Sequence, residues 1–515
     1  MVTNLKALVV VLVLAGMTFH LAKPLALRFM TEELFKQRRN LWLLLTVAAF
    51  ASPSFWIYAP IAAILVVKAA RHEPNPVALF VLAATAVPPV MLAIPTIGIG
   101  ALFDLSHQRL LALVLLLPVA LQLWNKPRPG EHAGALRAID IGVAGYLLVQ
   151  MVVLLPHDSV TNILRRGLHF VLDYGLVYYV LSRAVTTRAA LFETMACMVL
   201  SCAVLVLPSL FETMRSWLLY QGLGELWGKP DPFAWLFRGD SLRAQTSLGH
   251  SITFGFHMAI AFGMTLALAR AIGSSKTAWV VGAWMWLGLI AAFSRAPWLA
   301  AGMAAVVCAA LAPGGAANVK RLLMLAMVGG GLLMASPWGD DIMDVMPFIG
   351  TVDSTNVVYR QQLAATSWNL ILKNPILGDP LVLRDMESLR QGQGIIDLVN
   401  AYASVALFNG LVGLTLFVMP LVVASFTAWR ISQAKRDAEL SDTLLGAALV
   451  ASMMATLLHI ATAGYDWLLW ALLGLTTAYI ALDRREVTPI TPLSRRAPLP
   501  ARAVMQTQGR ARRAH

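Results

Sequence analysis

The chain of 515 residues is 58% hydrophobic and only 13% charged, with a formal net charge of +13 and a mean hydropathy of +0.70. This composition excludes an ordinary soluble globular protein, because the apolar residues gather in blocks close to the ~20 residues that span a bilayer. The blocks are continuous rather than alternating, which excludes a transmembrane β-barrel. The sequence therefore predicts an all-α, polytopic helical membrane protein.

Apolar runs recur along the chain and predict about 14 membrane crossings. The first run lacks the basic start and the Ala-x-Ala site of a cleavable signal, so we interpret it as a span. Ser52-Pro53-Ser54 divides the run at 41–67, which favours a short helical hairpin over a single kinked span. The runs cover approximately residues 5–22, 41–52, 54–67, 77–94, 109–124, 138–155, 167–182, 191–211, 251–269, 278–293, 298–312, 322–336, 399–424, 443–462 and 467–482.

Lysine and arginine residues concentrate in alternate short loops, and the positive-inside rule places those loops in the cytoplasm. The other loops then face outward, and two of them are long, at 212–250 and 337–398. The net charge thus reflects the membrane surface, and no nucleic-acid recognition motif is present. We divide the chain into N-terminal transmembrane helices (1–189), a transmembrane region with the two long loops (190–482) and a basic, disordered cytoplasmic tail (483–515).

Several nucleotide and metal motifs are absent from the sequence. There is no Gly-x4-Gly-Lys-[Ser/Thr] loop, no His-Glu-x-x-His and no Asp-x-Asp, so we expect neither a metal nor another cofactor. Asp340, Asp341 and Asp344 could ligate a hard cation, but we prefer to interpret them as solvated carboxylates after a turn. The three cysteines lie in apolar runs and form no disulfide or zinc pattern. The substrate should therefore arrive already activated.

Arg243 and Arg360 are the most informative residues, because each lies in a long outward segment of a chain that has few charges. We interpret them as a clamp that binds a lipid-linked diphosphate through two guanidinium groups. The alternative is that each arginine reaches the membrane interface or forms a surface ion pair.

The segment around Arg360 predicts an interfacial helix from about residue 356 to 373. A hydroxyl residue at 354–355 can cap its start. Asn374-Pro375 ends it, since the residue before proline avoids the α region. Its apolar side carries Tyr359, Leu363 and Leu370.

A sugar hydroxyl needs a general base, and Asp397 is one candidate. With Asn400 three residues later, it forms a stripe that we expect to face a cavity; the alternative is a helix N-cap. His250, just before the 251–269 run, is another candidate. Two further polar stripes have helical spacing, and their alternative interpretation is hydrogen bonding to a neighbouring helix. They are Asn162, Arg166, His169 and Asp173, and Ser452, Thr456 and His459.

From about residue 190 to 482 the chain resembles the O-antigen ligase/polymerase superfamily of bacterial membrane glycosyltransferases. The resemblance depends on the order of four motifs and on their places between apolar runs. The motifs are Arg243…Gly249-His250-Ser-Ile-Thr-Phe-Gly255, Ser294-Arg295-Ala-Pro-Trp298, Tyr359-Arg360…Trp368…Asn374-Pro-Ile-Leu-Gly378, and Val399-Asn400-Ala-Tyr402…Asn409-Gly410-Leu-Val-Gly413.

This resemblance implies a metal-independent transferase in the bacterial inner membrane with its active site on the periplasmic side. Arg243 and Arg360 match the arginines with which family members bind the undecaprenyl diphosphate of the donor, and we add Arg166 and Arg295 as supporting cations. The expected function is polymerisation of lipid-linked oligosaccharide repeat units into exopolysaccharide or O-antigen. The expected partners are the polyprenyl-diphosphate-linked oligosaccharide, the bilayer and a chain-length-regulating membrane protein.

Family ligases carry a histidine immediately before the asparagine that matches Asn400, whereas this chain has Val399. The departure weakens a ligase assignment and leaves three alternative bases, Asp397, His250 and His459. The expected acceptor or cavity residues are Asn400, Tyr359 and Asn374. Two other functions stay open: a ligase or oligosaccharyltransferase with a different acceptor, and a flippase or transporter that moves the lipid-linked sugar without chemistry.

Overall fold

The computed structural model describes residues 2–96, 100–126, 134–229, 233–271, 273–336, 354–391, 394–435 and 440–487. Helices make up most of these residues, and the strands among them form two short antiparallel hairpins. The all-α class predicted from composition is therefore confirmed. The last described helix continues to Val487, and the rest of the predicted tail lies outside the described residues.

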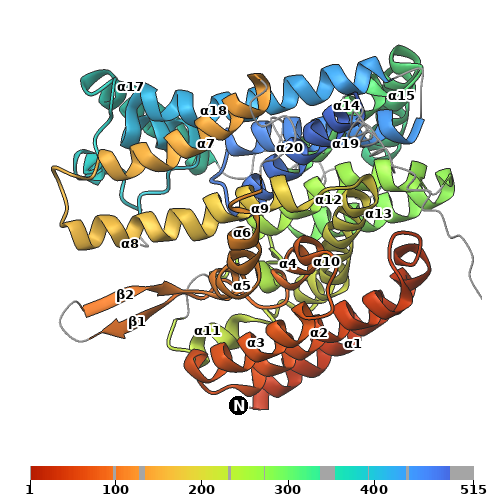
Figure 1. The fold of residues 1–515 in the computed structure, drawn as a ribbon, viewed down its shortest axis with the longest axis horizontal. Coiled ribbons are helices and arrows are strands. Elements are labelled where there is room, and N and C mark those ends of the chain that lie inside the picture. Colours follow the sequence, from red (N-terminus) through yellow and green to blue (C-terminus); the bar gives the residue numbers. More distant parts are fainter. Residues whose placement is uncertain are drawn as a thin grey trace, which may run out of the picture.

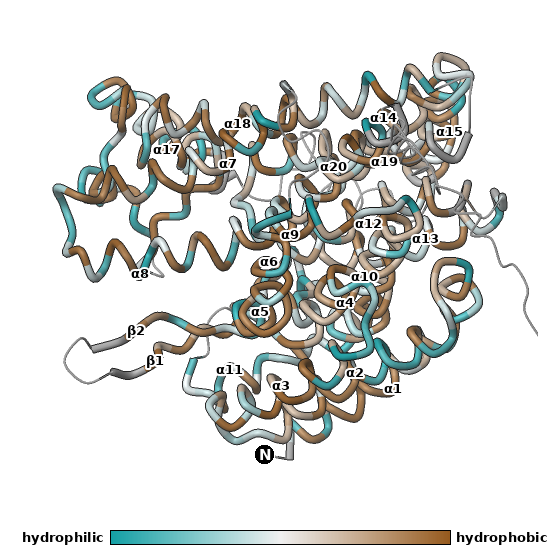
Figure 2. Tube along the Cα trace, viewed as in Figure 1, coloured by the Kyte–Doolittle hydropathy of each residue, from teal (hydrophilic) through white to brown (hydrophobic). Residues whose placement is uncertain are grey.

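Most helices lie side by side along a common direction, as Figure 1 shows. Hydrophobic residues run along their lengths (Figure 2). The helices are α1 (Val2–Ala26), α2 (Glu32–Ala51), α3 (Phe55–Ala70), α4 (Pro76–Ala83), α5 (His107–Leu111), η1 (Ala112–Leu116), α6 (Leu117–Leu123), α7 (Gly134–Val152), α8 (Val160–Phe170), η2 (Val171–Gly175), α9 (Leu176–Ala184), α10 (Arg188–Arg215), α11 (Gln221–Leu226), η3 (Thr246–Leu248), α12 (Ser251–Ala271), α13 (Ser275–Ala291), α14 (Arg295–Leu311), α15 (Gly315–Met334), α17 (Ser354–Lys373), η4 (Val382–Leu389), α18 (Ala401–Ala434), α19 (Leu440–Ile460) and α20 (Trp467–Val487). The strands are β1 (Leu92–Thr96), β2 (Gly100–Leu105), β3 (Phe237–Arg238) and β4 (Ser241–Leu242).

Six of the described helices are long and apolar enough to cross a membrane, namely α1, α7, α10, α12, α18 and α19. On α1, the side chains of Leu5, Val9 and Val13 are 63%, 54% and 55% exposed. A row of exposed large apolar side chains on a long helix requires an apolar solvent, which a bilayer supplies. The structure thus supports a membrane protein, while the number of about 14 crossings stays a prediction.

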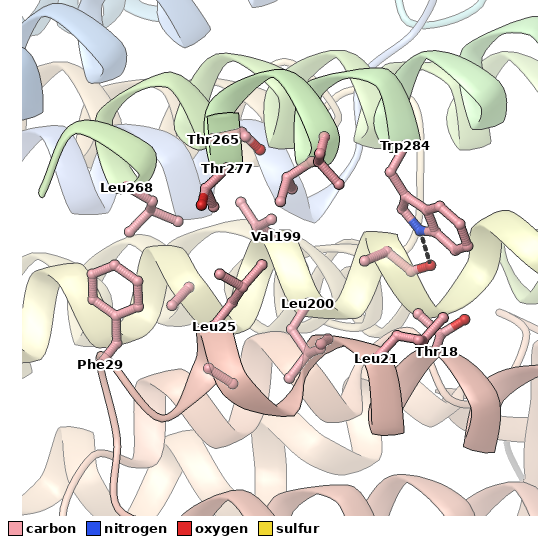
Figure 3. Close-up of a pocket in the computed structure, with 16 residues that line it drawn as sticks. Thr18, Leu21, Leu25, Phe29, Val199, Leu200, Thr265, Leu268, Thr277 and Trp284 are labelled. Carbon is pink, nitrogen blue, oxygen red and sulfur yellow. Dashed lines mark hydrogen bonds between the residues drawn. The ribbon is translucent and has the colours of Figure 1, made fainter. Parts of the chain in front are cut away.

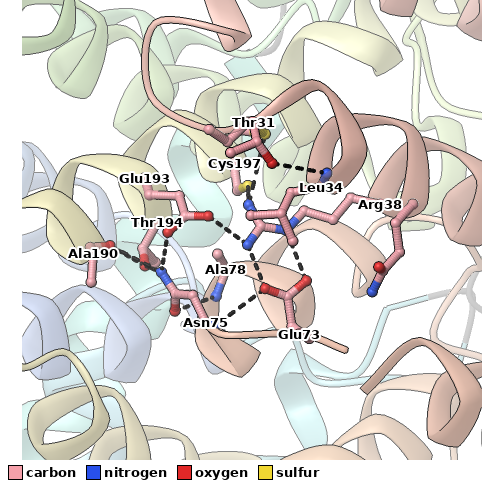
Figure 4. Close-up of polar contacts among 12 residues, drawn as sticks. Thr31, Leu34, Arg38, Glu73, Asn75, Ala78, Ala190, Glu193, Thr194 and Cys197 are labelled. Atoms are coloured by element: carbon pink, nitrogen blue, oxygen red, sulfur yellow. Dashed lines mark hydrogen bonds and ion pairs between the residues drawn. The ribbon is translucent and has the colours of Figure 1, made fainter. Parts of the chain in front are cut away.

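Two sides of the helical body can be distinguished. The β1–β2 hairpin projects from one of them, at the left of Figure 1, and we call this the hairpin side. The described parts of the predicted cytoplasmic loops lie at the opposite helix ends, which we call the basic side. There Arg38 of α2 pairs with Glu73 at 2.5 Å and with Glu193 of α10 at 2.6 Å (Figure 4). Arg38 is 1% exposed, so the pairing satisfies a buried charge and ties the starts of α2 and α10 together.

The predicted hairpin at 41–67 is confirmed. Helix α2 ends at Ala51, and the Ser54 hydroxyl accepts the N–H of Trp56 to start α3. The two helices are antiparallel, because Gln37 near the start of α2 donates to the carbonyl of Ala69 at the end of α3, at 2.7 Å.

The expected span at 77–94 is wrong. Helix α4 stops at Ala83, and β1 begins at Leu92. Pro88 and Pro89 lie between them and supply no backbone N–H, so the helix cannot continue through this run. The apolar residues that follow form the β1–β2 hairpin, in which Leu92 lies opposite Leu105.

The stripe expected on the 167–182 span is also wrong, because the π turn η2 interrupts the regular helical spacing. Asp173 instead pairs with Arg109 of α5 at 2.7 Å. His169 accepts the N–H of Asp104 of β2 at 3.1 Å. Hydrogen bonding to neighbouring elements, the alternative interpretation, is therefore confirmed for these two residues.

Helix α17 confirms the predicted helix and its end before Asn374, while its position at the membrane interface stays a prediction. The chain that follows docks on a break in α18 at Gly410, whose φ is 62°. Leu411 donates to the carbonyl of Pro375 at 2.8 Å, and Asp379 donates to that of Leu407 at 2.8 Å. A side chain at Gly410 would collide with the backbone of Ile376. The motifs around 374–378 and 409–413 thus fasten α17 to α18.

Candidate functional site

The segment that carries Arg243 is held by a buried carboxylate. Glu212, in the last turn of α10, is 1% exposed. Its side chain accepts three backbone N–H groups, from Leu219 at 3.0 Å and from Gln245 and Thr246 at 2.9 Å each. Glu212 therefore fixes the backbone directly after Arg243.

The same segment packs on the turn between α13 and α14. Ala244 donates to the carbonyl of Ala291 at 2.9 Å, and Arg243 Nε donates to that of Ala292 at 3.4 Å. Arg295 is the first residue of α14, directly after this turn. The structure therefore brings the Arg243 segment and Arg295 to one turn.

His250 is half-buried at the start of α12, where its Nδ1 accepts the N–H of Ile252 at 3.2 Å. Burial, and then the charge of Arg243, lower the pKa of His250 to about 4. The imidazole is therefore neutral at pH 7 and adds no positive charge to the site. It is a weaker proton acceptor than an ordinary histidine.

A buried histidine–carboxylate pair involves α12, the helix that follows the Arg243 segment. His257 of α12 is 2% exposed, and its Nε2 lies 2.9 Å from Asp466 in the α19–α20 loop. The other Asp466 oxygen accepts the N–H of Leu468 at 2.9 Å and so caps α20. A carboxylate in this position orients an imidazole for proton transfer. The sequence interpretation missed both residues, although an aspartate between two apolar runs was a signal.

His459 of α19 belongs to the same cluster. Its ring stacks on Phe256, with centroids 4.2 Å apart and an interplanar angle of 5°. The side chain is 2% exposed, and in the described part of the chain its Nδ1 has no hydrogen-bond partner. Ser452 and Thr456, the other members of its stripe, bond to the carbonyls of Ile260 and Ser452. His459 is thus the one member of this stripe whose buried polar atom stays unsatisfied.

Arg360 lies on α17, exposed, beside Asp397. Tyr359 Oη accepts the N–H of Asp397 at 3.0 Å, which fixes the aspartate next to α17. Burial raises the pKa of Asp397, although the charge of Arg360 opposes the shift. A carboxyl group with a raised pKa is a better proton acceptor than an ordinary aspartate.

The expected stripe through Asp397 and Asn400 is wrong, because α18 begins only at Ala401. Asn400 is the N-cap, and its side chain accepts the N–H of Ala403 at 3.1 Å. Ala401 in turn donates to the carbonyl of Ala463 in the α19–α20 loop, at 3.2 Å. The start of α18 is therefore attached to the loop that carries Asp466.

A cavity of about 230 Å³ lies among α7, α8 and α18. Tyr465, next to Asp466, is part of its wall and exchanges a hydrogen bond with Tyr146 at 2.6 Å. Arg166 also lines it, 3.7 Å from Asp158. Its other polar side chains are Gln150, Ser404 and Asn409. The cavity therefore combines amides, hydroxyls, one guanidinium and aromatic rings, and its lining residue Tyr465 is the chain neighbour of Asp466.

Two remaining expectations lie elsewhere. Asn374 is exposed after the end of α17, on the outside of the joint with α18. Asp340, Asp341 and Asp344 lie outside the described residues. Among the residues that the structure describes, no group of three or more His, Cys, Asp and Glu side chains could hold a metal.

No protein-family model matches the chain, and no curated protein matches it either.

Proposed function

We propose that the protein is a membrane glycosyltransferase that polymerises polyprenyl-diphosphate-linked oligosaccharide repeat units. The observation that carries the proposal is the buried His257–Asp466 pair, whose histidine lies on the helix after the anchored Arg243 segment and which is attached through the α19–α20 loop to the start of α18. Proton-transfer groups and cations thus occur together in a protein that is otherwise poor in charge.

The reaction needs both kinds of group. The acceptor hydroxyl oxygen attacks the anomeric carbon of the donor, the bond from that carbon to the diphosphate oxygen breaks, and the electron pair leaves with the diphosphate. Guanidinium groups stabilise the growing negative charge with paired hydrogen bonds, a role for Arg243 and Arg360, with Arg295 in support. The hydroxyl proton goes to a base. His257, oriented by Asp466, joins Asp397 and His459 as a candidate for that base, and the pKa near 4 weighs against His250.

The cavity lined by Arg166, Gln150, Ser404 and Asn409 supports a saccharide acceptor. Amide and hydroxyl side chains can donate to and accept from sugar hydroxyls, and the neighbouring tyrosine rings offer apolar faces. A second lipid-linked saccharide is the acceptor that polymerisation requires.

The test is an analysis of lipid-linked glycans in a strain without the gene, together with an assay of the purified protein. Single repeat units should accumulate in the strain, and purified protein should convert a polyprenyl-diphosphate repeat unit into longer lipid-linked chains. Accumulation of finished polymer would indicate a ligase instead. Repeat units retained on the cytoplasmic leaflet, with no product formed in vitro, would indicate a flippase.

A further inference from the structure

An apolar groove runs along the outside of the helical body between α1, α10, α12 and α13 (Figure 3). Its volume is about 340 Å³. Helices α1, α10 and α12 are among those long and apolar enough to cross a membrane, and α13 is a shorter apolar helix. The groove therefore lies within the part of the protein that lipid surrounds.

The walls of the groove offer hydrocarbon and no vacant polar group. Trp284 donates its indole N–H to the carbonyl of Ala203 at 3.0 Å, a bond drawn in Figure 3. The hydroxyls of Thr18 and Thr265 donate to carbonyls of their own helices at 3.1 and 2.8 Å. The hydroxyl of Thr277 donates to Ser274 at 3.0 Å. Because these groups are satisfied internally, the chemistry of the walls selects an apolar chain.

The length of the groove fits one leaflet. It extends along α1 from Thr18 to Ala26, which is about 12 Å at the helical rise per residue, and continues to Phe29 in the turn after α1. Half of the hydrocarbon core of a bilayer is about 15 Å thick. An acyl chain of a single leaflet is therefore long enough to fill the groove.

Charge at one end of the groove identifies the kind of lipid. Phe29, Leu268 and Thr277 lie at that end, and exposed Arg28 and Lys276 are the chain neighbours of Phe29 and Thr277. Both residues belong to the basic side of the protein. Two cations beside a hydrocarbon groove complement a phosphate headgroup above its acyl chain.

We propose that the groove binds one acyl chain of an anionic phospholipid, with the headgroup phosphate between Arg28 and Lys276. The polyprenyl chain of a donor would also be apolar, but its diphosphate is expected at Arg243 and Arg360, and Arg243 lies at the opposite end of the helices. The proposal is independent of the proposed function, because it concerns a lipid in the leaflet on the basic side.

Native mass spectrometry of the purified full chain tests the proposal. Phosphatidylglycerol and phosphatidylcholine with equal acyl chains are added separately in detergent. The wild-type protein should retain one phosphatidylglycerol. Ala22→Phe, which places a ring in the groove from the half-buried side of α1, should lose it. The matched control is Val13→Phe, on the lipid-exposed face of the same helix outside the groove, which should retain the lipid.

A second pair of variants tests the headgroup. Arg28→Gln with Lys276→Gln should lower the preference for phosphatidylglycerol over phosphatidylcholine by about 30-fold, since each basic residue near the phosphate contributes about 1 kcal/mol, which is about fivefold. Lys68→Gln with Arg71→Gln removes the same charge at the end of α3 and should leave the preference unchanged. The proposal is overturned if Ala22→Phe keeps wild-type occupancy, if the wild-type protein does not discriminate between the two lipids, or if a polyprenyl lipid displaces phosphatidylglycerol.

Discussion

Replacing Glu212 with alanine should release the segment that carries Arg243. The carboxylate is 1% exposed and accepts the backbone N–H groups of Leu219, Gln245 and Thr246, which its removal would leave without a partner. A buried donor without a partner costs about 1–3 kcal/mol. Even about 1 kcal/mol for each of the amides of Gln245 and Thr246 corresponds to a tenfold or larger increase in the local opening equilibrium of this segment.

Hydrogen exchange of the purified protein measures this opening directly. The amides of Gln245 and Thr246 should exchange at least about tenfold faster in Glu212→Ala than in the wild type. Ser209→Ala is the matched control. Ser209 is buried one turn earlier on α10, and its hydroxyl donates only to the carbonyl of Val206 in the same helix. Unchanged exchange at 245 and 246 in a folded Glu212→Ala protein would refute the role assigned to the carboxylate.

The remaining predictions concern catalysis. Arg243→Ala and Arg360→Ala should each lower turnover by about 10²–10³, with partial rescue by lysine, and full polymer yield from both variants would contradict the diphosphate clamp. Burial raises the pKa of Asp397, so activity that depends on this carboxylate should fall as the pH drops through the raised pKa. The charge of Arg360 lowers the same pKa, so Arg360→Gln should move the acidic limb of the kcat/KM profile to higher pH. An unshifted limb, or an unimpaired Asp397→Asn enzyme, would place the base elsewhere. His257→Gln and Asp466→Asn should be strongly non-additive in kcat, since an oriented pair acts as a unit, whereas additive losses would mean separate roles. Turnover should persist in excess EDTA if guanidinium groups supply the positive charge, and recovery of lost activity by Mg²⁺ would overturn this mechanism.

Local patterns in the sequence determined the class of the protein and several of its helices. Composition and continuous apolar runs predicted a helical membrane protein, because only helices and closed barrels satisfy the backbone polar groups inside a bilayer. Ser52-Pro53-Ser54 predicted the turn between α2 and α3, and Asn374-Pro375 predicted the end of α17. In both places proline acts on the backbone next to it, so no distant contact is needed.

Only the tertiary structure decided which polar residues meet. His257 and Asp466 are 209 positions apart, and nothing near either residue in the sequence identifies its partner. The same is true of Glu212, whose partners Gln245 and Thr246 lie 33 and 34 positions away. Regular helical spacing also failed to predict a shared face for His169 and Asp173, because the π turn η2 lies after His169. Their partners come from other elements: Asp173 pairs with Arg109, and His169 accepts the N–H of Asp104. Sequence periodicity predicts which residues share a helix face only while the helix stays regular. Long-range packing determines where the helix becomes irregular.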